Sequence, residues 1–305
     1  MRIKPTELMT RAARFRELNQ AGRLLLPNAW DAASARVFEE AGFPALGTTS
    51  AGIAYVEGYQ DAEHITRDAM VRAIAKIARA VSIPVSADIE GGYGPTAGDV
   101  GETVDAVVDA GAVGINLEDA NHYGGTSPLL GVDEQSERIA AARDVASRRG
   151  MSLVINARTD TFLLNLGADL DDRVAITADR GAHYLQAGAD LVFVPMLVNT
   201  SVIAQLVGRL PGPISVMALP EAPSAGDLFT AGVARVSIGQ MGILAVLGTL
   251  KNIALELIQH GTWRSIEQTF YGFGEAEALF AHRSQEGRES AAESAIGNHI
   301  DARRG

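Results

Sequence analysis

The stretch Val85–Gly94, with the sequence Val-Ser-Ala-Asp-Ile-Glu-Gly-Gly-Tyr-Gly, carries the clearest structural signal in this chain. It begins with a short apolar run that has the length of a buried strand. Asp88 and Glu90 follow, two residues apart, and glycines then interrupt the chain. Because side chains two apart in a strand point to the same face, we expect these carboxylates to project together at the end of the strand.

This pair of carboxylates has two interpretations. Two like charges side by side are costly unless a cation neutralises them. Mg²⁺ is a hard cation that takes carboxylate oxygens and retains waters, so a metal site is one interpretation. The other is a pair of loop carboxylates that bind backbone amides. The rest of the chain has to decide between them.

Composition excludes several kinds of chemistry. The 305 residues are 47% hydrophobic, which allows one large domain with an extension. There is no cysteine, so disulfides, thiolate nucleophiles and thiolate-bound metals are excluded. The three lysines, Lys4, Lys76 and Lys251, do not follow strand-like runs, which argues against a Schiff-base lysine.

Charge and hydropathy restrict the partners and the location. The net charge is −11 and no basic cluster exceeds an arginine pair, so we expect neither nucleic acid nor a membrane as partner. No uninterrupted apolar run approaches the roughly 18 to 20 residues of a membrane span. The N-terminus does not resemble a secretory signal. A cytoplasmic protein is therefore expected.

Short apolar runs alternate with longer amphipathic stretches, and glycine repeatedly follows the helical stretches, as in Asp109-Ala110-Gly111. Eight strand-like runs with helical crossovers predict an α/β fold, a parallel (β/α)8 TIM-type barrel. An open doubly wound sheet is the alternative, but no glycine-rich dinucleotide fingerprint follows the first run. The runs are Leu24–Asn28, Ala45–Ser50, Val85–Glu90, Val113–Asp119, Leu153–Asp160, Leu191–Pro195, Ile214–Ala218 and Arg235–Gly239. The helical segments between them include Ala32–Ala41, Ala62–Val81, Asp99–Ala110, Asp133–Arg149 and Arg173–Ala187.

The chain after residue 240 has a different pattern. From Met241 apolar residues recur at helical spacing and form one stripe, and a second segment, Ser265–Arg288, is also helical in pattern. These helices exceed what a barrel needs. We therefore predict a barrel over residues 1–240 that carries the active site, and a helical extension over residues 241–305 that packs against another subunit. The polar end after Arg288 is expected to be loose.

Polar residues gather at the predicted strand ends, where barrel enzymes place their chemistry. Glu118 and Asp119 end one run, and Arg158 and Asp160 end the next. Acids on adjacent strands with one arginine nearby indicate a metal site that faces an anionic substrate. The alternatives are that Glu118 or Asp119 caps its loop and that Arg158 is a structural counter-ion. A turn of small residues, Thr48–Gly52, offers amides that could hold a carboxylate or phosphate.

Five motifs lie in order at these strand ends, between residues 26 and 160. They are Leu26-Pro27-Asn28-Ala29-Trp30-Asp31, Gly47-Thr48-Thr49-Ser50-Ala51-Gly52, Asp88-Ile89-Glu90-Gly91-Gly92-Tyr93-Gly94, Asn116-Leu117-Glu118-Asp119 and Asn156-Ala157-Arg158-Thr159-Asp160. Together they resemble the phosphoenolpyruvate mutase/isocitrate lyase superfamily. The resemblance implies a barrel whose C-terminal helices swap between subunits of a homodimer or homotetramer. It also implies Mg²⁺ or Mn²⁺ and a small carboxylate substrate.

The resemblance also implies roles for individual residues. Asp88 would bind the metal, with Glu90 and Glu118 acting directly or through water. Glu90 stands where many members have aspartate. The substrate would contact Asp61 in the loop after the second run, the turn Thr49, Ser50 and Ala51, and Arg158, which would stabilise charge on the reacting oxygen.

The loop Ala120–Pro128 contains neither the cysteine of isocitrate and methylisocitrate lyases nor the lysine expected of phosphonomutases. His122 in this loop is a candidate proton donor or acceptor, against the alternative of a solvated histidine. The predicted function is a Mg²⁺-dependent lyase or decarboxylase that acts on a small 2-oxo or 2-hydroxy (di)carboxylate through a metal-stabilised enolate. Phosphonomutase or phosphonopyruvate hydrolase chemistry, and a catalytically inactive binder of 2-oxo acids, remain as alternatives.

Overall fold

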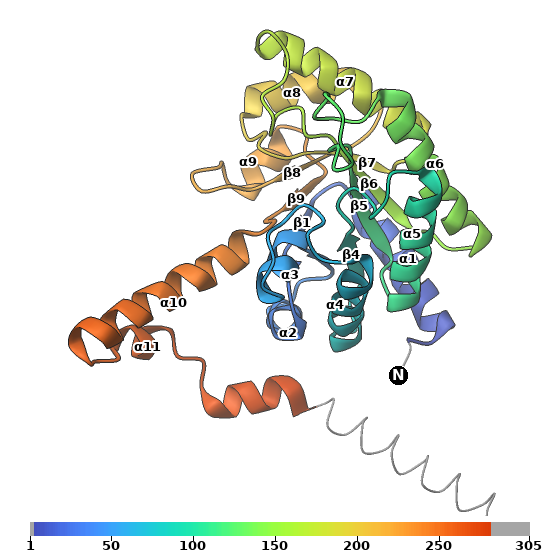
Figure 1. Ribbon diagram of the computed structural model, residues 1–305. Helices are drawn as coiled ribbons and strands as arrows, with labels where there is room; N and C mark the ends of the chain where they lie inside the picture. Colours follow the sequence, from blue (N-terminus) through green and yellow to red (C-terminus); the bar gives the residue numbers. More distant parts are fainter. Residues whose placement is uncertain (1–2, 282–305) are drawn as a thin grey trace, which may run out of the picture. The chain divides into compact units, whose positions relative to one another are not determined.

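The computed structural model describes residues 3–281 and contains a sheet of nine parallel strands with helices packed around it (Figure 1). The spatial order is β1-β9-β8-β7-β6-β5-β4-β3-β2. The strands are β1 (Leu24–Leu26), β2 (Asn28–Ala29), β3 (Leu46–Thr48), β4 (Val85–Asp88), β5 (Gly114–Glu118), β6 (Val154–Arg158), β7 (Leu191–Val194), β8 (Ile214–Met217) and β9 (Arg235–Ser237). The predicted TIM-type barrel is confirmed. The exchange of helices between subunits stays a prediction.

β1 and β2 are two halves of the first predicted strand, and Pro27 separates them. Proline has no N–H to donate to a ladder, so a break is expected there. β1 pairs with β9, whereas β2 pairs with β3. The segment from Leu24 to Ala29 therefore pairs with the last strand, β9, through its first half and with β3 through its second half.

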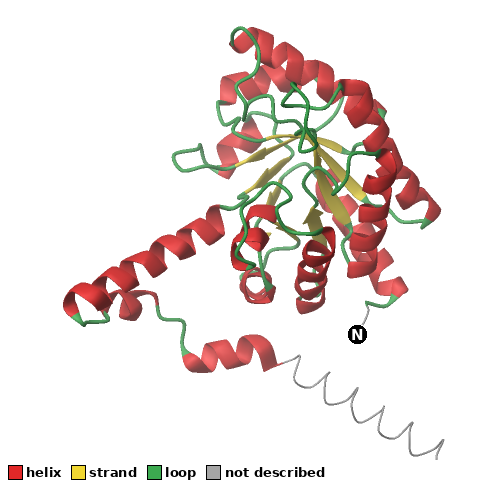
Figure 2. Cartoon of the chain, in the orientation of Figure 1, coloured by secondary structure: helices red, strands yellow, loops and turns green. Residues whose placement is uncertain are grey.

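Helices follow the strands, as the sequence pattern predicts (Figure 2). They are α1 (Pro5–Gln20), α2 (Ala32–Glu40), α3 (Ser50–Val56), α4 (Arg67–Ala80), α5 (Ala97–Ala110), α6 (Val132–Arg148), α7 (Leu170–Gln186), α8 (Thr200–Arg209), α9 (Ala225–Thr230), α10 (Met241–His260) and α11 (Arg264–Thr269), and residues 273–281 are also helical. α4 begins five residues later than predicted, at Arg67 rather than Ala62. Ala62 and Glu63 have positive φ angles of 75° and 58°, and the Thr66 side chain caps the helix.

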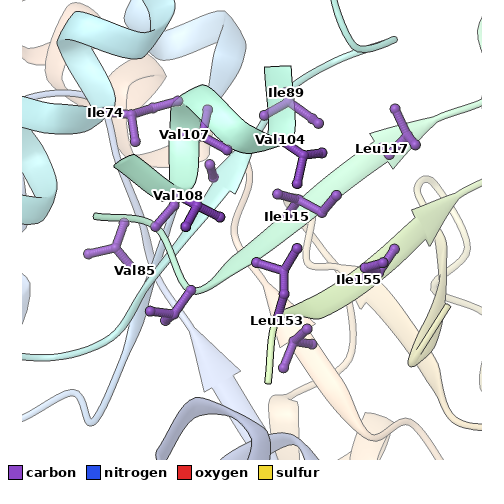
Figure 3. Close-up of a cluster of buried hydrophobic side chains, with 14 of the residues drawn as sticks. Ile74, Val85, Ile89, Val104, Val107, Val108, Ile115, Leu117, Leu153 and Ile155 are labelled. Atoms are coloured by element: carbon purple, nitrogen blue, oxygen red, sulfur yellow. The ribbon is translucent and has the colours of Figure 1, made fainter. Parts of the chain in front are cut away.

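Alternation along β4, β5 and β6 separates the core from the barrel interior. Val85, Ile115, Leu117 and Ile155 are buried in one hydrophobic cluster that also includes Val104 of α5 (Figure 3). Residues of the opposite parity point into the barrel. At the carboxyl ends of the three strands these are Asp88, Glu118 and Arg158, which explains why they share one site.

The interior below these residues is polar, although barrel interiors are commonly filled by Val, Ile and Leu. Arg235 is 1% exposed and donates to Asn116 Oδ1 at 3.0 Å and to Ser215 Oγ at 3.3 Å. Asn156 donates to the same Asn116 oxygen at 2.8 Å. Burial lowers the pKa of Arg235 to about 9. This cluster forms a hydrogen-bonded floor between β5, β6, β8 and β9.

The chain divides into two compact units, residues 1–244 and 245–305, and the division falls inside α10. The part of the second unit beyond residue 281 lies outside the described residues, and so does the loose end predicted after Arg288. Among the described residues one helix, α10, is long and apolar enough to cross a membrane by length and composition alone, with 6% of the scanned window buried. Lys251 and Glu256 interrupt its apolar sequence, so α10 contains no continuous apolar run of this length.

Gly114 allows α1 to pack against the base of the barrel. A Cβ at this position would lie 2.5 Å from Cε1 of Phe15, which is fully buried, and 3.0 Å from Ser86 Oγ. We predict that Gly114→Ala lowers the free energy of unfolding by about 1–3 kcal/mol, as overpacking does. Gly208→Ala in α8 is the control, because nothing lies within 4 Å of its Cβ position, and its stability should not fall. Denaturant unfolding of both variants tests this, and equal stabilities would contradict it.

Candidate active site

Asp88 ends β4 and is held by the turn after β3. Its Oδ2 accepts hydrogen bonds from Ser50 N at 3.0 Å and Ser50 Oγ at 2.8 Å, and its own N–H donates to Thr48 Oγ1 at 2.9 Å. The predicted turn Thr49–Ala51 is the start of α3, and the Thr49 side chain caps that helix. Burial raises the pKa of Asp88, although Arg158 and Ser50 oppose the change. The small-residue turn therefore fixes an acid from the neighbouring strand.

Glu90 does not continue the strand as predicted. β4 stops at Asp88, and Glu90 has a φ of +50°, so the alternation that would place both carboxylates on one face ends between them. Its carboxylate accepts from Tyr93 Oη at 2.6 Å and from Glu63 N at 2.5 Å. Burial raises the pKa of Glu90 to about 7, and the charges of Asp88 and Asp61 add to this. The two acids therefore interact electrostatically without the parallel geometry that was expected.

Glu118 ends β5 and lies between the two predicted catalytic groups. Its Oε2 is 2.6 Å from Arg158 Nη1, and its Oε1 is 2.7 Å from His122 Nε2. Burial raises the pKa of Glu118, and Arg158 opposes the change. Burial lowers the pKa of His122, but the hydrogen bond and charge of Glu118 raise it by more, so the pKa of His122 is raised overall. The structure thus brings His122, Glu118 and Arg158 into one contact chain.

Arg158 is also bound to Asp160, through Nε at 2.6 Å and Nη2 at 2.9 Å. The counter-ion interpretation of Arg158 therefore describes a real contact. Burial lowers the pKa of Arg158, but Glu118, Asp160 and Asp88 together raise it, so it stays charged. Three of the five guanidinium N–H groups point at these two carboxylates, and two are left for a ligand.

Asp119 has a structural role. It is fully buried, and its Oδ1 accepts from Asp160 N at 3.0 Å. Its Oδ2 accepts from Tyr184 Oη at 2.8 Å and Arg180 Nη1 at 3.0 Å. The alternative that Asp119 caps the loop after its own strand differs from these side-chain contacts, which go to the loop after β6 and to α7. Asp119 joins β5 to the loop after β6 and to α7.

The site holds more negative than positive charge. Asp61, Asp88, Glu90, Glu118 and Asp160 influence one another or share partners, whereas Arg158 and His122 are the cationic partners in these contacts. Asp61 Oδ1 is buried without a hydrogen-bond partner among the described residues. A buried carboxylate oxygen without a partner is costly, and a divalent cation or its bound water would satisfy it.

These oxygen donors fit Mg²⁺ or Mn²⁺ better than a softer ion. No group of three or more His, Cys, Asp or Glu side chains within residues 3–281 is arranged to hold an ion directly. Both oxygens of Glu90 and of Glu118 already have protein partners. The arrangement therefore fits an ion that contacts Asp88 and keeps most of its waters, as Mg²⁺ commonly does.

Sequence reasoning missed a network of loop residues around the site. Tyr123 Oη donates to the Glu63 carboxylate at 2.9 Å and accepts from Gly94 N at 2.9 Å. Glu63 Oε1 accepts from Tyr93 N at 2.8 Å, and Arg138 lies 5.6 Å from the centre of the Tyr123 ring. Positive φ angles at Glu63 and Tyr93 distort both loops. No sequence spacing relates Glu63 to Tyr123, so the network could not be read from the chain.

Comparison with known proteins identifies the family to which the chain is similar. The family model for phosphoenolpyruvate phosphomutase matches residues 15–258. A Mycobacterium tuberculosis protein, Rv1998c, is 36% identical over 229 residues, or 74% of this chain and 82% of its own. An oxaloacetate decarboxylase of Bradyrhizobium sp. is 32% identical over 70% of this chain and 72% of its own. A phosphonopyruvate hydrolase of Variovorax sp. is 27% identical over 85% and 91%.

Solved structures agree with these relatives. A Burkholderia cenocepacia protein described as a lyase/mutase superposes with a TM-score of 0.83 at 36% identity, and the match covers 90% of this chain and 97% of that one. A phosphonopyruvate hydrolase in complex with oxalate and Mg²⁺ superposes with a TM-score of 0.77 at 25% identity, covering 92% and 98%. The similarity therefore extends across the barrel.

The Tyr123 hydroxyl group ties the loop at residues 120–128 to Glu63 and Gly94. Tyr123→Phe should lower the free energy of unfolding by about 1.5–3 kcal/mol, the value of a hydrogen bond to a charged group. Amide hydrogen exchange in this loop should become faster. Tyr59→Phe is the control, because Tyr59 is 54% exposed. Exchange that is unchanged in Tyr123→Phe would show that the loop is held by other contacts.

Proposed function

The chain belongs to the phosphoenolpyruvate mutase/isocitrate lyase superfamily, and from this premise we propose that it is a cytoplasmic Mg²⁺- or Mn²⁺-dependent lyase. Its reaction would be carbon–carbon cleavage or decarboxylation of a small 2-oxo or 2-hydroxy (di)carboxylate. The expectation of an enzyme is confirmed at the level of the superfamily, whose named members include decarboxylases, hydrolases and mutases. The observation that carries the proposal is the surplus of buried carboxylates around Arg158.

We propose that Asp88 contacts the metal and that Glu90, Glu118 and Asp61 hold its waters. Ser50 keeps Asp88 in place through two hydrogen bonds. When bound, the ion would polarise the carboxylate and the adjacent oxygen of the substrate. The turn Thr49, Ser50 and Ala51 is the proposed seat of the substrate carboxylate, next to Asp88.

Arg158 is the proposed group that stabilises negative charge as the bond at C3 breaks. Its guanidinium is preorganised by Glu118 and Asp160, so it needs no rearrangement when the charge develops. His122 is the proposed proton donor or acceptor. The raised pKa of His122, which follows from its contact with Glu118, favours a proton on its ring near neutral pH.

Phosphorus–carbon bond chemistry is the second candidate. The similarity to phosphonopyruvate hydrolase covers more of this chain than either of the other relatives described above. Against it, the loop Ala120–Pro128 has no lysine. A third possibility is a binder of 2-oxo acids that does not turn over. Incubation with oxaloacetate, alkylmalates and phosphonopyruvate, with and without Mg²⁺, distinguishes the three by which compound is consumed.

The metal proposal predicts the effect of one substitution. Asp88→Asn should keep the fold, because its amide oxygen can still accept from Ser50, but should weaken Mg²⁺ affinity at least about tenfold. Isothermal titration with MgCl2 measures this. Asp144→Asn on the outer surface of α6 is the control. Unchanged Mg²⁺ affinity in Asp88→Asn would remove the basis for the site.

We also propose that residues 241–305 form the contact between subunits, in a homodimer or homotetramer with exchanged helices. The observation that supports this is the apolar stripe of α10, where Leu250 is 54% exposed and Ile258 is 83% exposed. Large apolar side chains this exposed are costly in water and commonly mark an interface. A membrane is the other apolar environment that would cover them.

Leu250→Glu combined with Ile258→Glu should convert the assembly to monomers, because a buried unpaired charge opposes association. Light scattering after gel filtration gives the mass. Asn252→Glu adds a charge to the polar face of the same helix and should leave the assembly intact. A wild-type chain that is monomeric, or that partitions into phosphatidylcholine vesicles, would contradict the proposed interface.

A further inference from the structure

The barrel mouth has two chemically different walls. The ends of β4, β5 and β6 carry the charged groups Asp88, Glu118 and Arg158. The ends of β7, β8 and β9 form the opposite side of the mouth. Their side chains and loops decide what the part of the substrate that lies away from the charged groups can be.

Alternation shows which side chains of β7 and β8 face the interior. Val192, Val194 and Val216 are buried in the cluster formed with α8 and its neighbours. Phe193 and Met217 have the opposite parity and therefore point into the barrel. Phe193 pairs in register with Arg158, so this wall begins directly beside the charged groups.

Met217 lies across the end of this wall. A Cβ at Gly239 would be 2.2 Å from Met217 Sδ, so the thioether lies directly against the backbone after β9. Met196 in the loop after β7 is 44% exposed and has a φ of +65°, which is unusual for a residue with a side chain. Phe193 and Met217 therefore place an aromatic ring and a thioether on this side of the barrel interior, and Met196 adds an exposed thioether in the loop after β7.

The loops that follow β6, β7, β8 and β9 contain no cationic residue of their own. Residues 159–169, 195–199, 218–224 and 238–240, all of them described, contain no lysine, arginine or histidine, and they include the acids Asp160 and Glu221. Arg158, which pairs in register with Phe193, already binds Glu118 and Asp160. A second charged group of a substrate would lose its hydration here without gaining a partner.

We infer that the wall formed by Phe193, Met217 and Met196 receives an uncharged alkyl group of the substrate. This inference rests on the proposed function and narrows its substrate class. The end of the acid that is chelated next to Asp88 stays the same, and the carbon chain beyond it is a hydrocarbon. Acids that carry another carboxylate at that end bind less tightly.

Titration calorimetry in the presence of Mg²⁺ with three probes tests this inference. Oxalate reports the chelated end alone. 2-Oxopentanoate and 2-oxoglutarate have five carbons each and differ in whether the far end is methyl or carboxylate. Wild type should bind 2-oxopentanoate at least about tenfold more tightly than 2-oxoglutarate, a difference that one apolar contact and one desolvated charge can supply.

Met217→Lys should reverse this preference. Met196→Lys, on the exposed loop, should shift it in the same direction and serves as the test if Met217→Lys does not fold. Met9→Lys, the same change on α1, where Met9 is 41% exposed, should leave the preference unchanged. Equal or tighter binding of 2-oxoglutarate by wild type, with oxalate bound normally, would overturn the inference and leave the proposed function standing. Failure of oxalate to bind with Mg²⁺ would overturn both.

Discussion

The ion pairs of Arg158 with Glu118 and Asp160 set the electrostatic balance at the carboxyl end of the barrel. A buried guanidinium between two carboxylates offsets part of their desolvation cost, but it does not neutralise Asp88, Glu90 and Asp61 as well. Burial is the main cause that raises the pKa of Asp88 and of Glu90, and the charges of neighbouring acids add to it. The fold keeps these acids together because each one ends or follows a parallel strand. Helices pack on the outer face of the sheet and hold its strands in register.

Much of this arrangement was predictable from the sequence. The alternation of apolar runs and amphipathic segments gave the barrel, because parallel strands buried on both sides need continuous apolar runs. The acids at the ends of β4 and β5 and the arginine at the end of β6 were predictable for the same reason, since carboxyl ends of parallel strands share one edge. The position of a residue at a strand end predicts which other residues lie close to it. It does not predict the hydrogen-bond partner of each group.

The parts that could not be predicted depend on backbone torsion and on contacts between loops. The positive φ of Glu90 turns its carboxylate toward Tyr93 and Glu63, and a period-two pattern contains no signal for that turn. Glu63 and Tyr123 meet although 60 residues separate them. The small-residue turn after β3, the proposed seat of the substrate carboxylate, also has a helical role that its composition did not predict. It is the first turn of α3, and its serine binds Asp88.

The break at Pro27 has a consequence for how the barrel is completed. β1 pairs only with β9, and these two strands lie at opposite ends of the barrel sequence. Contacts between such distant segments carry a large entropy cost and form late in folding. Until then β1 and β8 are open edges that another chain could pair with. Arg235 lies on β9 and donates hydrogen bonds to Asn116 and Ser215. The last strand to dock therefore supplies the side chain that links β5 and β8 inside the barrel. A nascent chain whose β9 is still inside the ribosome therefore has an open barrel. During this interval aggregation competes with closure of the barrel.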